Sequence, residues 1–158
     1  GRTDGGAAAE PAYRATLGLA CDLAAEKGMT VLIEPINRRH VAGYHLAHVE
    51  QAAETIAALG RDNLRIMFDC YHTQIMQGDL IRRFQTHLPL VGHVQIAGVP
   101  DRREPDVGEV HYPALFDRLE SLGYDGWIGC EYRPRGETRA GLGWGRAFGL
   151  NDGQSGTA

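Results

Sequence analysis

Apolar runs alternate with amphipathic stretches along the whole chain. Short apolar runs predict four strands, at 30–34, 63–69, 90–96 and 126–131. Apolar residues at helical spacing, with prolines near the starts and glycines just past the ends, predict helices at 11–27, 44–59, 79–88, 113–122 and 138–148. Asp79 is the expected cap of the third of these helices. Strictly alternating strands and helices are typical of an α/β fold with parallel strands.

Each predicted strand ends on a side chain that carries a metal-ligand oxygen. Successive members of this set are about 26 to 36 residues apart in sequence, and they are Glu34, Asp69, Gln95 and Glu131. Parallel strands bring their carboxyl ends to one edge of the sheet, where α/β proteins keep their chemistry. One such carboxylate alone usually caps the next helix or forms a loop salt bridge. Four in register instead predict a cation site.

The two faces of the predicted strands differ in character. The residues that alternate with the strand-end set are expected on the opposite, helix-covered face, namely Val31, Ile33, Phe68, Val94, Ile128 and Cys130. An inner face that becomes polar at one end resembles the interior of a barrel. A complete eight-stranded barrel needs about 250 residues, and this chain has 158. We therefore expect a partial TIM barrel of four parallel βα units over residues 1–150, followed by a disordered tail at 151–158.

Composition narrows the range of partners. The chain is 43% hydrophobic and 23% charged, as expected for one globular domain, and its formal charge of −4 gives no basic field for nucleic acid. Small molecules are the expected ligands. The odd set of Cys21, Cys70 and Cys130 lacks CxxC spacing and fits a reducing cytoplasm. No apolar stretch approaches the roughly 18 residues that cross a bilayer, so no membrane association is expected.

Several segments in order carry a family resemblance. They are LIEPIN (32–37), FDCYHTQ (68–74), GDL (78–80), GHVQIAGVPDRREPD (92–106) and GYDGWIGCEYRP (123–134). Together they resemble the hydroxypyruvate isomerase family, a group of xylose isomerase-like TIM barrels, over roughly residues 13–150. The resemblance implies that the chain corresponds to the second half of a (β/α)8 barrel, starting at the helix before the fifth strand.

The resemblance also implies a ligand set and a reaction. In the family, the residues that correspond to Glu34, Asp69, Gln95 and Glu131 surround a divalent metal. An all-oxygen shell favours Mg²⁺ first and Mn²⁺ second. The implied reaction converts hydroxypyruvate to tartronate semialdehyde through an enediolate, with Glu34 and Glu131 as the pair that transfers protons.

Three further side chains are candidate substrate contacts. His72, expected on the loop above the second strand, suits a substrate oxygen, although a purely structural hydrogen bond is about equally expected. Arg102 and Arg103 suit a substrate carboxylate because a guanidinium presents a matching planar fork. The alternative for both arginines is a solvated loop with surface ion pairs. After EPIN, where an aspartate and a proline are expected, this chain has His40 and Ala42.

Other functions stay open at this level. Within the same chemistry, a 2-oxotetronate isomerase or a sugar epimerase is an alternative. A metal-dependent phosphoesterase or abasic-site nuclease is a second class, although it calls for more His and Asp ligands and a basic face. A non-catalytic fragment is the third, because half a barrel leaves sheet edges unpaired. Two copies could pair into a ring, or a missing N-terminal half-barrel could complete it.

Overall fold

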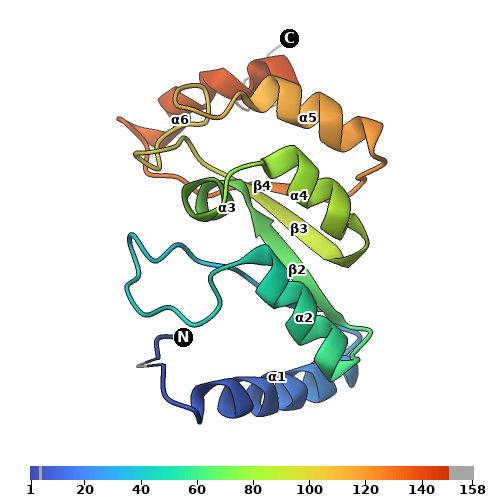
Figure 1. The fold of residues 1–158 in the computed structure, drawn as a ribbon. Coiled ribbons are helices and arrows are strands. Elements are labelled where there is room, and N and C mark those ends of the chain that lie inside the picture. Colours follow the sequence, from blue (N-terminus) through green and yellow to red (C-terminus); the bar gives the residue numbers. More distant parts are fainter. Residues whose placement is uncertain (4, 150–158) are drawn as a thin grey trace.

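Four parallel strands form one sheet in chain order, β1-β2-β3-β4. The computed structural model describes residues 1–3 and 5–149 (Figure 1). The strands are β1 (Val31–Ile33), β2 (Leu64–Asp69), β3 (Val91–Ile96) and β4 (Ile128–Cys130). Each neighbouring pair is parallel, so a helical crossover joins successive strands. The predicted α/β fold of four parallel βα units is confirmed.

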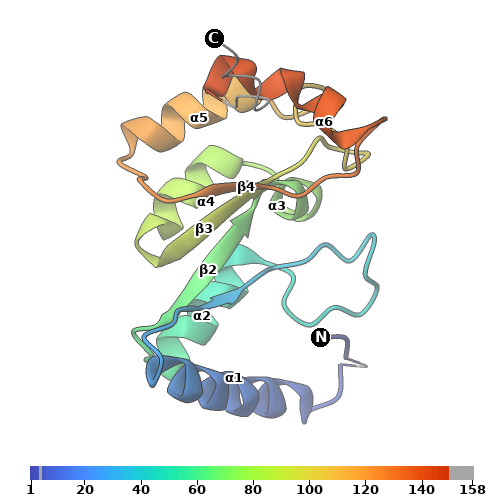
Figure 2. The same ribbon diagram turned by 180° about the vertical axis from the view of Figure 1, so that it is seen from behind.

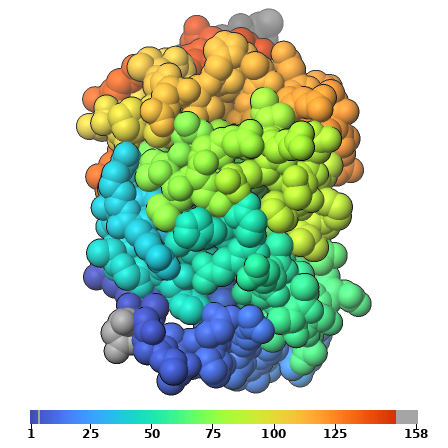
Figure 3. All heavy atoms as spheres, in the orientation of Figure 1, coloured from blue at the N-terminus to red at the C-terminus, as the bar shows by residue number. Residues whose placement is uncertain are grey.

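Helices cover one side of this sheet and leave the other side open. They are α1 (Ala9–Ala25), α2 (Val49–Leu59), α3 (Cys70–Met76), α4 (Leu80–His87), α5 (Tyr112–Ser121) and α6 (Thr138–Gly141), with 3-10 turns η1 (Leu88–Leu90) and η2 (Leu142–Phe148). In Figure 1 the helices α2 and α4 lie in front of the strands, and Figure 2 shows the uncovered face from behind. The units follow one another across the molecule in sequence order (Figure 3).

The core lies between the sheet and this helical layer. Ile33, Leu64, Ile66, Phe68 and Val94 are at most 5% exposed and pack against apolar residues of α2, α4 and α5. The alternate strand residues on the open face are only partly buried, except Asp69, which is buried at the carboxyl end of β2. The period-2 division predicted from the sequence is therefore present in the three strands β1 to β3.

The second predicted helix starts later than expected, and a short helix was missed. Residues 44–48 precede α2 because they pair with other loops: the Ile36 amide donates to the Leu46 carbonyl, and Tyr44 bridges Arg2. The segment after Asp69 was expected to be a loop but forms α3. Asp79 does occupy the N-cap of α4, yet its side chain makes no capping hydrogen bond because its backbone is left-handed, with φ 52°.

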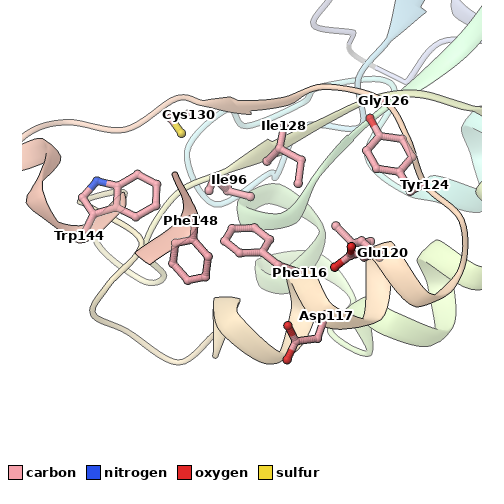
Figure 4. Close-up of a pocket in the computed structure, with 11 residues that line it drawn as sticks. Ile96, Phe116, Asp117, Glu120, Tyr124, Gly126, Ile128, Cys130, Trp144 and Phe148 are labelled. Atoms are coloured by element: carbon pink, nitrogen blue, oxygen red, sulfur yellow. The ribbon is translucent and has the colours of Figure 1, made fainter. Parts of the chain in front are cut away.

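The last βα unit has less regular secondary structure than the pattern predicted. The expected helix at 138–148 is one α-helical turn followed by a 3-10 segment, since four of the residues in 141–149 are glycine. Ile128 and Cys130 were expected under helices, but both are exposed on the edge strand β4. Beside them, Phe116, Trp144 and Phe148 line a cavity of about 420 Å³ (Figure 4). None of the strand-end site residues lines this cavity.

Two further predictions concern the tail of the chain and its relation to membranes. The tail at 151–158, predicted to be disordered, lies outside the described residues. Among residues 1–3 and 5–149, no helix combines the length and the apolar character that crossing a bilayer requires.

Candidate metal and catalytic site

All four strand-end residues lie at the same edge of the sheet. Glu34 follows β1 directly, Asp69 closes β2 and Gln95 lies in β3 in register with Asp69. Glu131 follows β4, and its amide donates to the Ile96 carbonyl at 3.1 Å. The parallel register, set by the apolar strand positions, thus brings residues almost a hundred positions apart to one edge.

Three of the side chains at this edge form a tight group. Glu34, Asp69 and His72 each offer one ligand atom, and these atoms all lie within 4.8 Å of one another. Asp69 is also the N-cap of α3, because its Oδ1 accepts a hydrogen bond of 2.8 Å from the His72 amide. His72 therefore sits in the first turn of a helix, not on the loop that we expected. The cap fixes the position of its ring relative to Asp69.

The neighbours of His72 determine its tautomer. Its Nδ1 accepts a hydrogen bond of 3.1 Å from the backbone N–H of Asn37 and lies 2.6 Å from the side-chain nitrogen Asn37 Nδ2. Both neighbours are donors, so Nδ1 carries no proton. Its Nε2 then bears the hydrogen and lies 3.7 Å from Glu34 Oε1. Burial, with a smaller contribution from Arg102, lowers the pKa of His72 to about 4. At neutral pH the ring is thus an uncharged hydrogen-bond donor that faces the carboxylate group.

Two buried oxygens at this edge have no hydrogen-bond partner. They are Glu34 Oε1 and Gln95 Oε1, among the described residues. Buried polar atoms are nearly always paired in folded proteins, because leaving one unpaired costs free energy. A carboxylate oxygen and an amide oxygen, close to a second carboxylate, are the donor types that bind a hard divalent cation. The residues therefore fit Mg²⁺ or Mn²⁺.

The two inner carboxyl groups titrate unusually. Burial, together with the charges of Asp69 and Glu131, raises the pKa of Glu34 to about 7. Burial also raises the pKa of Asp69 to about 6, although the His72 amide and Arg102 act in the opposite direction. Negative charge at this edge is thus disfavoured until a positive group balances it.

Glu131 and Arg102 form an ion pair beside this group. Arg102 Nη2 donates to Glu131 Oε1 at 2.7 Å, and its guanidinium lies 5.2 Å from the centre of the Tyr71 ring. The Glu131 side chain is 53% exposed. It is not part of the group formed by Glu34, Asp69 and His72, whose ligand atoms lie within 4.8 Å of one another. The structure thus brings Glu34, Asp69 and His72 together, while Glu131 is turned towards Arg102.

Arg103 points elsewhere. Its Nη1 donates to the carbonyl oxygens of Arg133 and Pro134, at 3.4 and 3.1 Å. Within the described part of the chain, no hydrogen bond or ion pair connects its side chain to the strand-end carboxylates. Arg102 is therefore the arginine at the site, and Arg103 connects two loops.

Sequence reasoning missed two neighbours of the site. Asn37, which is fully buried, fixes the His72 ring, and its place in the segment EPIN was the only available signal. Tyr71 is also buried, and the ring of His40 stacks against it with centroids 5.8 Å apart. The Tyr71 hydroxyl lies 3.1 Å from His40 Nδ1. His40 thus lines the edge of the site through Tyr71, a contact that no local pattern reveals.

The raised pKa of Glu34 predicts a stability effect that depends on pH. Below pH 4.5 the carboxyl group is neutral in both the folded and the unfolded chain, whereas above about pH 7 the folded chain must hold a buried charge. In EDTA, Glu34→Gln is therefore expected to be more stable than wild type by about 1–3 kcal/mol at pH 8, with little difference at pH 4.5. Urea unfolding at both pH values measures this, with exposed Glu54→Gln as the control. An equal difference at both pH values would contradict it.

The comparisons with known proteins agree with this geometry. Residues 1–148 match the family described as "Xylose isomerase-like TIM barrel". The chain is 52% identical over 132 residues to a 2-oxo-tetronate isomerase of Cupriavidus necator, covering 84% of this chain and 51% of that protein. It is 39% identical over 147 residues to the hydroxypyruvate isomerase of Escherichia coli, covering 91% of this chain and 57% of that protein.

A solved structure gives the same result for the fold. The crystal structure of a Brucella melitensis protein named "AP endonuclease, family 2" superposes with a TM-score of 0.85 at 46% identity, covering 88% of this chain and 54% of that one. The chain thus spans about half the length of the curated relatives it matches. With its four parallel βα units and its strand-end carboxylates, this chain belongs to the xylose isomerase-like TIM barrel family.

Proposed function

We propose that this site serves the isomerisation of a short hydroxy-oxo acid, with hydroxypyruvate to tartronate semialdehyde as the first candidate reaction. One observation carries the proposal: Glu34, Asp69 and Gln95 gather at the carboxyl edge of the sheet, where one buried oxygen each of Glu34 and Gln95 has no hydrogen-bond partner. The names of the relatives, hydroxypyruvate isomerase and 2-oxo-tetronate isomerase, support the substrate class. The four-carbon 2-oxotetronate is the closest alternative substrate, and a sugar is a more distant one.

The proposed site holds a divalent metal, Mg²⁺ first and Mn²⁺ second. Glu34, Asp69 and Gln95 are the residues that would hold it, with Glu131 reaching in if its carboxylate leaves Arg102. When bound, such an ion supplies positive charge next to the oxygens of an α-hydroxy carbonyl compound. Because Asn37 occupies His72 Nδ1 and leaves the proton on Nε2, we assign this ring to a hydrogen bond instead of metal ligation.

The proton transfers are proposed for the two glutamates. Isomerisation removes a proton from one carbon and returns a proton to its neighbour through an enediolate. Glu34 lies inside the cluster, where its carboxylate can accept the first proton or its protonated form can donate the second. Glu131 lies across the edge, directly after β4, so the substrate would be placed between two carboxyl groups. His72 Nε2–H then donates to a substrate oxygen.

Arg102 is the proposed partner of the substrate carboxylate. Its guanidinium already binds a carboxylate, that of Glu131, and rests over the Tyr71 ring. The carboxylate of a substrate acid would take the place of the Glu131 carboxylate and bind the Arg102 guanidinium with the same planar geometry. Arg103 is less suited, because its guanidinium binds loop carbonyls.

The open face of the sheet suggests how such a site would be enclosed. β1 and β4 are the edges of the described sheet, and the relatives are about twice as long as this chain. We propose that four more βα units cover this face, supplied by an N-terminal half-barrel or by a second copy of the chain. Closure matters because a misplacement of about 1 Å can lower a rate about a hundredfold.

The proposal is tested by incubating the chain with hydroxypyruvate and Mg²⁺ in D₂O and following the reaction by NMR. Deuterium at the substrate carbon and formation of tartronate semialdehyde are expected. Metal binding without exchange would favour the alternative of a non-catalytic fragment. Size-exclusion chromatography of the same sample shows whether two copies pair, because a monodisperse monomer excludes that arrangement.

The nuclease alternative has less support. Its one favourable sign is that the similar Brucella protein is named an AP endonuclease. However, a phosphoesterase of this kind uses a cluster of two or more metals, and one group of at least three potential ligands is present in residues 1–3 and 5–149. The formal charge of −4 also gives no general attraction to a nucleic acid backbone.

A further inference from the structure

The loop that carries Arg102 is held in an unfavourable conformation. Arg102 has φ 55°, in the left-handed region that residues with a side chain rarely adopt. Its amide donates to the Gly98 carbonyl at 2.8 Å, and its own carbonyl accepts from the Arg133 amide at 2.7 Å. Such a conformation persists only where the surroundings enforce it, and it is often found at functional sites.

A buried carboxylate lies two residues further along the same loop. The Glu104 side chain is 2% exposed, although sequence alone suggested a solvated loop here. Its Oε1 and Oε2 accept from the Arg135 amide at 2.9 and 3.2 Å, and Oε2 also accepts from Arg135 Nε at 2.9 Å. Arg135 Nη2 in turn donates to Asp106 Oδ1 at 2.6 Å. We call the Glu104–Arg135 contact the loop clamp.

The clamp joins the two loops that carry Arg102 and Glu131. Residues 97–111 connect β3 to α5, and residues 131–137 connect β4 to α6. The same two loops are also joined by the hydrogen bond from the Arg133 amide to the Arg102 carbonyl and by the contacts of Arg103 with the Arg133 and Pro134 carbonyls. Gly141 of α6 packs closely against the Glu104 carboxylate, because a Cβ added at Gly141 would lie 2.9 Å from Glu104 Oε1. Burial by itself raises the pKa of Glu104, but the hydrogen bonds from the Arg135 backbone and guanidinium together outweigh it, so the pKa is lowered.

We infer that Glu104 is a positioning residue: through Arg135 it fixes the two loops so that Arg102 faces an anionic substrate at the carboxylate edge. This inference rests on the proposed function in assigning the substrate carboxylate to Arg102. Glu104 itself touches neither the proposed substrate nor the strand-end carboxylates. Its effect reaches the site through the backbone of Arg102 and Arg133.

Binding of tartronate, a stable diacid, in the presence of Mg²⁺ provides the first test by calorimetry. Glu104→Gln is expected to weaken binding about tenfold, and Arg102→Gln about a hundredfold. In the double variant, Glu104→Gln should add nothing to Arg102→Gln, because its effect passes through Arg102. Exposed Glu109→Gln, on the same loop, is the control. Additive losses in the double variant would overturn the inference.

A second perturbation covers the case in which Glu104→Gln does not fold. Gly141→Ala presses on the Glu104 carboxylate, whereas a Cβ at Gly143 meets nothing within 4 Å. Gly141→Ala should therefore weaken tartronate binding several-fold, and Gly143→Ala should leave it unchanged. Equal behaviour of the two alanine variants would count against the clamp.

Hydrogen exchange separates this inference from the proposed function. In Glu104→Gln or Gly141→Ala, the amides of Arg102 and Arg133 should exchange faster while those of β3 keep their protection. If wild type binds no tartronate, the proposed function fails and the exchange result alone decides the clamp. Unchanged protection of both amides would overturn it.

Discussion

Replacing Glu34 by glutamine is expected to reduce metal-dependent exchange of the substrate proton by about 10²–10⁴-fold. Glutamine keeps the shape of the side chain but cannot accept a proton. The carboxylate it replaces lies within 4.8 Å of ligand atoms of Asp69 and His72, where burial raises the pKa of Glu34 to about 7. A group with this pKa can both accept and return a proton near neutral pH. Deuterium incorporation into hydroxypyruvate, followed by NMR at saturating Mn²⁺, measures the loss.

The control must separate chemistry from general damage. Glu54→Gln changes an exposed glutamate of α2 and should leave the exchange rate unchanged. Saturating Mn²⁺ separates the loss of the base from weaker metal binding. If Glu34→Gln exchanged protons at the wild-type rate under these conditions, Glu34 would not be the base, and the proton-transfer role would pass to Glu131 or to another group.

Replacing Asp69 by asparagine is expected to weaken Mn²⁺ binding by at least about a hundredfold. Loss of an outer partner of a metal ligand alone costs about 10–100-fold in affinity, and here a charged ligand itself is lost. Asparagine is as good an N-cap as aspartate, so it should still accept from the His72 amide and keep α3 in place. The paramagnetic resonance of free Mn²⁺ measures the affinity, and circular dichroism checks the fold.

Asp79→Asn is a matched control for this variant. Asp79 is the N-cap residue of the next helix, α4, but it is exposed and makes no side-chain capping bond. Asparagine tolerates its left-handed backbone. Metal affinity should therefore stay at the wild-type value in Asp79→Asn. Wild-type affinity in Asp69→Asn would instead place the metal away from the strand-end carboxylates.

The two variants also distinguish the roles of the neighbouring carboxylates. Glu34 is proposed both to hold the metal and to move a proton, so its replacement affects exchange even at saturating metal. Asp69 is buried and bound by the His72 amide, which suits a ligand better than a proton carrier. Exchange in Asp69→Asn should therefore recover in part as the Mn²⁺ concentration rises.

The sequence alone determined the sheet and the residues at its carboxyl edge. Strand alternation is a local property with a period of two, so it placed Phe68 and Val94 towards the helices and Asp69 and Gln95 at the edge. The regular spacing of strands then required parallel crossovers. These features follow from short-range pattern and chain length, and for this reason they could be predicted without coordinates.

Only the tertiary structure decided how the side chains at that edge are used. His72 faces Glu34 because Asn37, 35 residues away, holds its Nδ1, and Glu131 turns outward because Arg102 binds it across 29 residues. The burial of Glu104 likewise depends on Arg135 from another loop. Hydrogen bonds between distant loops depend on the three-dimensional path of the backbone, which no local pattern of apolar and polar residues encodes.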